Sequence, residues 1–458
     1  MIFEQHYLEC LSQASYFIGD ESSGRAVVVD PRRDIAPYLE SAEEHGMAIE
    51  LVLETHFHAD FLSGHLEVAE ATGAAIAYGS KAETEFDSRK LEDGERIELG
   101  EVVLEIRHTP GHTPESISIV VYETADSAPH AVLTGDTMFI GDVGRPDLLS
   151  SKGVTSAELA SDLYDSLHTK LMTLPDETIL YPGHGAGSSC GKNLSSDTSS
   201  TIGAQRSTNY AVADMTKDQF IQVVTDGQTA PPGYFSYDAM LNRQNRPLLD
   251  ESAAPNELSL SDVLSKQNTG AVVLDTRSPD EFALGHVGGS INIGLSGRYA
   301  EFAGGVIAPD AAIILVTEPG HELEAKVRLA RIGFDNVVGC LEDPVRSMSE
   351  NPKAVHRNSR VNVAQMKEAM ESVENLQLVD IRQPGETEGG VVEGAILIPL
   401  TRLNERLNEL DAAKPTIVYC AGGFRSSIAA SRMIGAGFTD ISDLLGGYGA
   451  WEAAHAPA

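Results

Sequence analysis

The second half of the chain contains an internal repeat with a constant offset of 105 residues. Asp275 and Arg277 open a series in the first copy that recurs in the second copy from Asp380 and Arg382 onward. The matched positions that follow are Glu281, Gly285, Val287, Gly289, Ile291, Ile293 and Leu295 in the first copy, and Glu386, Gly390, Val392, Gly394, Ile396, Ile398 and Leu400 in the second. Because such self-similarity marks one folding unit used twice, we expect two copies of one α/β domain here.

With 458 residues, the chain has room for about three domains. The region before the repeat alternates short β-rich runs with turns, and helical spacing appears between them at 66–72 and 156–172. This pattern predicts sheets flanked by helices. We expect one domain at 1–250, a second at 251–355 and a third at 356–458.

Composition limits the partners and the compartment. A net charge of −35 would repel phosphate backbones and anionic lipid, so we expect no nucleic acid and no membrane among the partners. No apolar stretch approaches the roughly 18 residues of a membrane span, and the first residues do not resemble an export signal. Four scattered cysteines, without a CxxC pair, fit a reducing compartment. We expect a cytoplasmic protein, and a homo-oligomer is compatible with the sequence.

Potential metal ligands follow several of the apolar strands in the first region. They are His56, His58, Asp60, His112, Asp136 and His184. Neighbouring glycines, such as Gly111 and Gly183, permit the tight turns that bring such side chains together. The recurrence of these residues at strand ends predicts one metal site.

The motifs THFHADF, TPGHT, TGD and YPGH, in this order, resemble the metallo-β-lactamase superfamily over roughly residues 1–240. The resemblance implies an αββα sandwich with the metal site between two sheets. One position departs from the pattern, because Phe61 stands where a dinuclear site has its next His, and a phenyl ring cannot bind a metal. A single ion held by two imidazoles and one carboxylate matches instead the facial triad of non-haem Fe(II) enzymes.

Residues 55–64 and 141–147 look like the persulfide dioxygenases, an iron-using branch of that superfamily. The resemblance implies one Fe(II) per chain, with Zn as the alternative, and the ligands His56, His112 and Asp136. The three remaining candidates, His58, Asp60 and His184, would orient these ligands and hydrogen-bond bound water. Cys190 is either an inert buried thiol or a group that handles persulfide.

Cys420 directly follows the apolar run 416–419 in the segment CAGGFRS. This segment resembles the active loop of rhodanese sulfurtransferases, so the family implies two rhodanese-like α/β domains over 255–458. Backbone N–H groups of the loop would surround a persulfide on Cys420, and the next helix would add positive potential at its N-terminus. The loop residues are Ala421, Gly422, Gly423, Phe424 and Ser426. Arg425 would stabilise the loop or attract an anionic acceptor, and the first copy, with Thr317 in place of the cysteine, would be non-catalytic.

These features predict an α/β multidomain enzyme, a non-haem Fe(II) persulfide dioxygenase fused to a sulfurtransferase. It would oxidise a low-molecular-weight thiol persulfide with O₂ to sulfite and thiol, and rhodanese sulfur transfer to sulfite would yield thiosulfate. One alternative is a glyoxalase II-like zinc thioester hydrolase with accessory sulfurtransferase domains. Another is a sulfur relay protein whose metal is only structural. The sequence does not identify the thiol carrier, which could be glutathione, coenzyme A, bacillithiol or cysteine.

Overall fold

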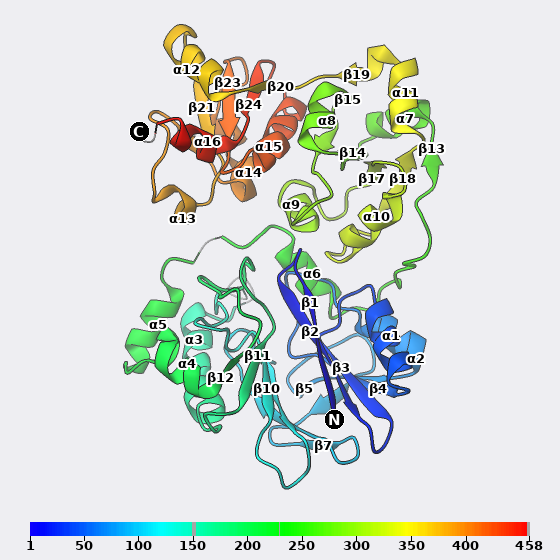
Figure 1. Ribbon diagram of the computed structural model, residues 1–458, viewed down its shortest axis with the longest axis vertical. Coiled ribbons are helices and arrows are strands. Elements are labelled where there is room, and N and C mark those ends of the chain that lie inside the picture. The colour runs from blue at the N-terminus through cyan, green and yellow to red at the C-terminus, as the bar shows by residue number, and fades with distance from the viewer. Residues whose placement is uncertain (149–152, 229, 456–458) are drawn as a thin grey trace. The chain divides into compact units, whose positions relative to one another are not determined.

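The computed structural model describes residues 1–148, 153–228 and 230–455, and its elements are labelled in Figure 1. The chain divides into two compact units. Unit 1 consists of residues 1–249 together with 330–333, and unit 2 consists of 250–329 and the chain from 334 onward.

Unit 1 is built around two six-stranded sheets. The first has the order β1 (Ile2–Leu8), β2 (Gln13–Asp20), β3 (Arg25–Val29), β4 (Ala48–Leu53), β5 (Ala75–Gly79) and β6 (Arg89–Leu91). The second has the order β12 (Ser200–Thr201), β11 (Ile179–Pro182), β10 (Ala131–Gly135), β9 (Ile117–Tyr122), β8 (Val103–His108) and β7 (Arg96–Glu98). The helices are α1 (Ala36–Glu44), α2 (His65–Thr72), α3 (Ser156–Ser166), α4 (Ile202–Thr208), α5 (Lys217–Thr225) and α6 (Phe235–Leu241).

The central strands of unit 1 are mostly apolar because much of both of their faces is buried. In β3, Val27 and Val29 belong to the core between the two sheets, whereas Val28 packs with Tyr38 of α1 on the outer face. On the other side of the sandwich, α3 contributes Leu163 to the core that covers the second sheet. The predicted αββα sandwich is therefore confirmed.

Unit 2 contains two five-stranded parallel sheets with equivalent strand orders. The first has the order β13 (Glu257–Leu258), β18 (Val337–Leu341), β17 (Ile313–Val316), β14 (Val272–Asp275) and β16 (Ile291–Asn292). The second has the order β20 (Ser359–Val361), β24 (Ile441–Leu444), β23 (Thr416–Tyr419), β21 (Gln377–Asp380) and β22 (Ile396–Leu397). A short antiparallel pair joins β15 (His286–Val287) and β19 (Val355–His356). The predicted pair of α/β domains is confirmed.

Helices flank both of these sheets, as Figure 1 shows. Those of the first copy are α7 (Leu260–Asn268), α8 (Pro279–Leu284), α9 (Tyr299–Val306), α10 (Glu322–Ala330) and α11 (Pro344–Glu350). Those of the second are α12 (Val363–Ser372), α13 (Pro384–Thr387), α14 (Leu403–Arg406), α15 (Phe424–Gly435) and α16 (Gly447–Ala453).

The repeated Asp-x-Arg motif has the same structural role in both copies. Arg277 pairs with buried Asp275 and donates to the carbonyl oxygen of Gly285 at 3.0 Å. The corresponding Arg382 pairs with buried Asp380 and donates to the carbonyl oxygen of Gly390 at 2.8 Å. The repeat is thus a structural one, since each arginine links the end of a central strand to the loop beyond the next helix.

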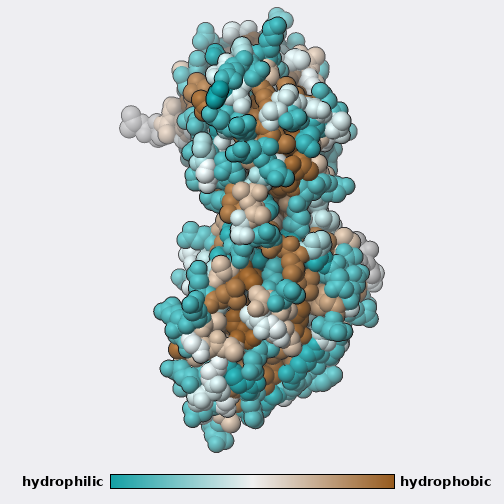
Figure 2. All heavy atoms as spheres, turned by 90° about the vertical axis from the view of Figure 1, so that its right-hand side faces the viewer, coloured by the Kyte–Doolittle hydropathy of each residue, from teal (hydrophilic) through white to brown (hydrophobic). Residues whose placement is uncertain are grey.

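Among the described helices, none combines the length and apolar character that a membrane crossing requires. On the face drawn in Figure 2, hydrophilic residues cover most of the surface, and smaller patches of apolar residues lie among them. The four cysteines, Cys10, Cys190, Cys340 and Cys420, are all free thiols.

Candidate metal and thiol sites

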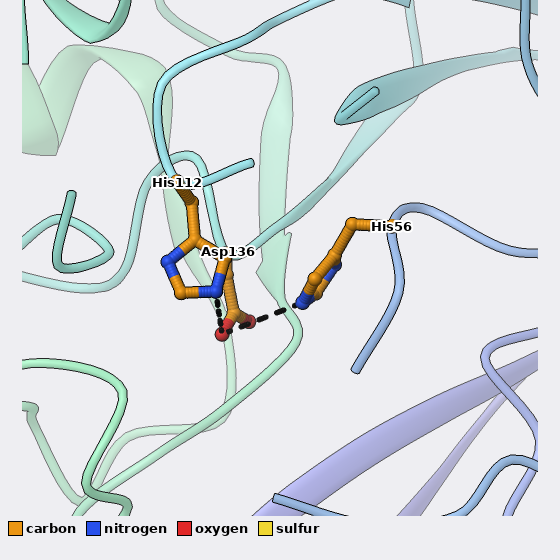
Figure 3. Close-up of side chains that lie close together, drawn as sticks. All are labelled: His56, His112 and Asp136. Carbon is orange, nitrogen blue, oxygen red and sulfur yellow. Dashed lines mark ion pairs between the residues drawn. The ribbon is translucent and has the colours of Figure 1, made fainter. Parts of the chain in front are cut away.

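Three side chains from three different loops of unit 1 converge at the edge of the sandwich (Figure 3). His56 follows β4, His112 lies in the turn between β8 and β9, and Asp136 follows β10 directly. Asp136 Oδ2 lies 3.8 Å from His56 Nε2 and 3.6 Å from His112 Nε2. The structure therefore brings together the three residues predicted as metal ligands, and all three are buried.

Neighbouring groups leave one nitrogen of each imidazole available to a metal. His112 Nδ1 faces the carbonyl oxygen of Arg145 at 2.9 Å, so this nitrogen carries the proton and Nε2 keeps its lone pair. His56 Nδ1 lies 2.9 Å from Thr55 Oγ1, whose own proton is donated to Asp30 at 2.7 Å. Thr55 Oγ1 therefore accepts from His56 Nδ1–H, and His56 Nε2 points into the site unprotonated.

The unsatisfied atoms at this site fit a cation. His56 Nε2 and Asp136 Oδ2 are buried without a hydrogen-bond partner among the described residues. Leaving such groups unpaired costs about 1–3 kcal/mol each, and a bound divalent metal would satisfy both. Two imidazoles and one carboxylate suit Fe(II) as well as Zn(II).

The electrostatics favour the protonation states that metal ligands need. Burial, followed by the charge of His58, lowers the pKa of His56 well below its usual value. Burial alone would raise the pKa of Asp136, but the charge and the hydrogen bond of His184 hold it well below its usual range. The site is thus prepared with a neutral imidazole and an ionised carboxylate.

A second cluster adjoins the first and contains Asp60, His184 and Cys190. His184 lies between two carboxylates, with Nδ1 at 2.8 Å from Asp136 Oδ1 and Nε2 at 2.7 Å from Asp60 Oδ2. Burial would lower the pKa of His184, but the two carboxylates raise it well above its usual value. His184 therefore orients the candidate ligand Asp136 directly, and Asp60 acts on that ligand through His184.

Cys190 lies beside this second cluster as a buried thiol. Burial raises the pKa of Cys190 well above its usual value, and the charges of Asp60 and Asp136 raise it further. The thiol is therefore protonated near neutral pH.

His58, which belongs to the same loop as His56, contacts other partners. Its Nε2 lies 3.1 Å from Asp30 Oδ1 and 3.3 Å from Glu54 Oε2. Burial would lower the pKa of His58, but these two carboxylates raise it to about 10. His58 is thus a buried cation that stabilises the loop, and the ring of buried Phe61 lies 4.2 Å from its imidazole.

Sequence analysis missed Asp30 and Glu54. Asp30 follows β3, so the rule that identified the other strand-end ligands could have found it. Its carboxylate accepts from the Thr55 N–H at 2.7 Å and from the Thr55 hydroxyl, which fixes the start of the metal loop.

A cavity of about 340 Å³ opens beside His112 in unit 1. Its lining includes Phe57, Asp147, Phe235 and Arg243. Asp147 accepts two hydrogen bonds from Arg145, at 2.7 and 2.8 Å. The cavity gives a small substrate a route to one of the candidate ligands.

The thiol site lies at the carboxyl end of β23 in unit 2. Cys420 is buried, and the N–H of Gly423 donates to its Sγ at 3.1 Å. The thiol lies 3.7 Å from Ser426 Oγ, and Gly423 has φ of +92°, which favours glycine. Of the predicted loop, Ala421 and Gly422 lie in the bend that follows Cys420, and Phe424 is the first residue of α15.

Arg425 has a defined partner in the structure, since its guanidinium pairs with the carboxylate of Glu386 at 2.7 Å. Burial alone would lower the pKa of Arg425, but Glu386 and the nearby Cys420 raise it. In the first copy, the corresponding place at the end of β17 holds a cavity of about 320 Å³ whose lining includes Glu318 and His321. No cysteine is among the described residues that line it.

The comparisons with known proteins agree with this architecture. Residues 8–184 match the family model of the metallo-beta-lactamase superfamily, and 259–344 and 362–454 match the rhodanese-like domain. A crystal structure of a metallo-beta-lactamase from Staphylococcus aureus subsp. aureus COL is 33% identical, with a TM-score of 0.67 over 75% of this chain and 99% of that one. The chain belongs to the metallo-beta-lactamase superfamily, and two rhodanese-like domains follow its first domain.

Two curated relatives of the first domain have different activities. Human persulfide dioxygenase ETHE1 is 30% identical over 37% of this chain, and the cytoplasmic hydroxyacylglutathione hydrolase of Arabidopsis thaliana is 34% identical over 39% of it. The matches span 63% and 66% of the lengths of these relatives, respectively. Similarity therefore supports an enzyme of this superfamily without choosing between oxidation and hydrolysis.

Proposed function

We propose that this protein is a non-haem Fe(II) persulfide dioxygenase coupled to a sulfurtransferase. The observation that carries the proposal is the donor set of the first domain. His56, His112 and Asp136 form one buried group of ligands, and buried Phe61 occupies the loop position where a dinuclear centre has another imidazole. The same chain also contains a second sulfur-handling site at Cys420.

The balanced reaction is RSSH + O₂ + H₂O → RSH + SO₃²⁻ + 2 H⁺. Fe(II), when bound by His56, His112 and Asp136, would supply the activation of O₂. Around it, the Arg145 carbonyl orients His112, and His184 orients Asp136. Phe57, which lines the cavity, gives the substrate an apolar wall close to the ligands.

Sulfur transfer would use Cys420. Its thiolate takes the outer sulfur from RSSH and releases RSH, which leaves a persulfide anion on the enzyme. Sulfite then attacks that outer sulfur, the S–S bond to Cys420 breaks, and thiosulfate leaves with the thiolate restored. The Gly423 N–H and the N-terminus of α15 stabilise the anionic sulfur in both states.

Cys190 is a candidate for persulfide handling in the first domain, because its thiol lies beside Asp60 and His184. The small-molecule partners in this proposal are the thiol persulfide, O₂ and sulfite. We place the reaction in the cytoplasm, where the four free thiols would stay reduced.

The second candidate is a zinc thioester hydrolase, which the similarity to the hydroxyacylglutathione hydrolase favours. O₂ uptake by the full chain separates the two candidates. We expect uptake, with sulfite as product, when glutathione persulfide is added and none with S-lactoylglutathione. His112→Ala should abolish the uptake, and thioester cleavage under anaerobic conditions without persulfide-dependent uptake would refute the dioxygenase.

A further inference from the structure

The cavity beside His112 contains the guanidinium of Arg243, which pairs with no carboxylate among the described residues. Arg243 lines this cavity, and its Nε is buried without a hydrogen-bond acceptor among the described residues. Its guanidinium carbon lies 4.3 Å from the centre of the Phe57 ring. A cation–π contact of this kind positions the guanidinium but leaves its N–H donors available to a ligand.

Two other arginines near the cavity, unlike Arg243, are paired with carboxylates. Arg246, three residues further along, pairs with Glu67 at 2.6 Å, and Arg145 pairs with Asp147 at 2.7 Å. Among the described residues that line the cavity, Asp147 is the acidic one. Its two carboxylate oxygens already accept hydrogen bonds from Arg145, so Asp147 does not neutralise Arg243. The described part of the cavity lining therefore carries a positive charge that no described carboxylate compensates, in a chain whose net charge is −35.

The position of Arg243 is fixed relative to the metal loop. Its neighbour Asn242 is buried and donates through Nδ2 to the carbonyl oxygens of His58 and Phe61, at 2.8 and 2.9 Å. Asn242 Oδ1 accepts from the N–H of Ser63 at 2.9 Å. The end of α6 is thus attached to the loop that contains His56, so a ligand that bridges Arg243 and the metal centre would meet two rigid points.

We propose that Arg243 determines specificity by binding a carboxylate of the thiol carrier while the persulfide sulfur lies at the metal centre. This proposal rests on the proposed function and names the substrate class, a persulfide whose carrier has an anionic group. Arg provides the planar pair of donors that a carboxylate matches. A cavity of about 340 Å³ suits a small carrier of amino-acid to tripeptide size.

Titration calorimetry on the metal-loaded full chain tests the proposal by measuring the affinity for reduced glutathione and for its diethyl ester. The experiment needs neither O₂ nor turnover. We expect glutathione to bind roughly 10- to 100-fold more tightly than the ester, which lacks the carboxylates. Arg243→Met should remove this difference, and Arg243→Lys should retain part of it. Arg89→Met, at an exposed arginine paired with Glu95, is the matched control and should keep the full difference.

Kinetics on the corresponding persulfides give a second measurement. In Arg243→Met, KM should rise for glutathione persulfide and stay unchanged for the persulfide of neutral 2-mercaptoethanol.

Equal affinity of the wild-type chain for glutathione and its ester, or an unchanged difference in both Arg243 variants, would overturn the proposal. A variant that loses affinity for sulfite but not for glutathione would also overturn it, since Arg243 would then bind the product anion. Absent O₂ uptake with intact glutathione binding would instead refute the dioxygenase activity and leave the Arg243 site in place.

Discussion

The two rhodanese-like copies have the same turn after the central strand, but a different group accepts the hydrogen bond of that turn in each copy. Each has a glycine in the left-handed region four residues after the end of the central strand, Gly320 with φ of +90° and Gly423 with φ of +92°. In the second copy the Gly423 N–H donates to the sulfur of Cys420 at 3.1 Å, whereas the Gly320 N–H donates to the carboxylate of Glu322 at 3.1 Å. The anion-binding turn is thus a property of the fold, and in the first copy a built-in carboxylate already occupies it.

The largest expected effect comes from removing the sulfur. Cys420→Ser should lower sulfur transfer to sulfite by at least about 1000-fold, because a hydroxyl cannot form a persulfide. Persulfide-dependent O₂ uptake should remain. Thiosulfate is measured in the same reaction, and Cys340→Ser, at a buried thiol of the first copy, is the control that should transfer sulfur normally. Thiosulfate formation at the wild-type rate in Cys420→Ser would refute sulfur transfer through Cys420.

The shared Asp–Arg pairs should respond alike in both copies. Arg277→Met and Arg382→Met each leave a buried carboxylate without its cation, which costs about 3–5 kcal/mol. Hydrogen exchange followed by mass spectrometry would show the loss in the copy that carries the substitution, and the exposed Arg346→Met should change little. If Arg382→Met destabilised its copy and Arg277→Met did not, the two motifs would have different roles.

Acid should destabilise the first copy more than the second. His286 is buried, donates through Nδ1 to the carbonyl oxygen of Phe282, and has its pKa lowered to about 4, mainly by burial. The unfolded chain takes up a proton at about pH 6.5, so this stability is complete above that pH and is lost as the pH falls toward 4, on the order of 2 kcal/mol. The corresponding residue of the second copy is Val391, which does not titrate.

Replacing His286 with Leu tests this difference between the copies. Protection factors for residues 272–316 should become nearly independent of pH between 6.5 and 4 in the variant. A wild-type first copy that is as stable at pH 4.5 as at pH 7 would contradict the assignment of a neutral, buried imidazole.

Removing the positive charge of Arg425 beside Cys420 should have a smaller effect. Arg425→Met should raise KM for sulfite by about tenfold and leave kcat within about twofold, because the guanidinium attracts the anionic acceptor. Arg425→Lys should recover part of the loss, and steady-state kinetics with sulfite as the varied substrate gives both constants. An equal fall in kcat with unchanged KM would indicate that Arg425 maintains the loop through Glu386 instead.

The reverse substitution should have almost no effect. Thr317→Cys places a thiol at the end of β17, but the Gly320 N–H remains paired with Glu322. We expect no sulfur transfer above that of Cys420→Ser when the two substitutions are combined. Substantial transfer in this double variant would show that the cysteine alone makes the difference between the copies.

The sequence was sufficient to predict the fold because its main signals are local and repeated. The Asp-x-Arg motif reappears at a fixed offset, and the strand-end rule gave six candidate ligands. The family resemblance then selected His56, His112 and Asp136, which the structure brings together. Arg243 could not be found in this way. It lies at the end of a helix far along the chain from the metal loop, and only tertiary packing through Asn242 places it there.

The roles of the two histidines in the metal loop are set by the side chains that surround them and not by residue type. His56 and His58 are two positions apart in one loop, yet one belongs to the ligand group and the other pairs with Asp30 and Glu54. Nothing in the spacing separates them, because the choice depends on carboxylates from neighbouring strands.

Metal analysis of the anaerobically purified chain tests the central claim most directly. With Phe61 in place of a nitrogen donor, the account predicts about one iron per chain, and Phe61→His should allow a second ion to bind. A pair of zinc ions in the wild-type protein, with no iron, would contradict it and indicate a hydrolytic centre.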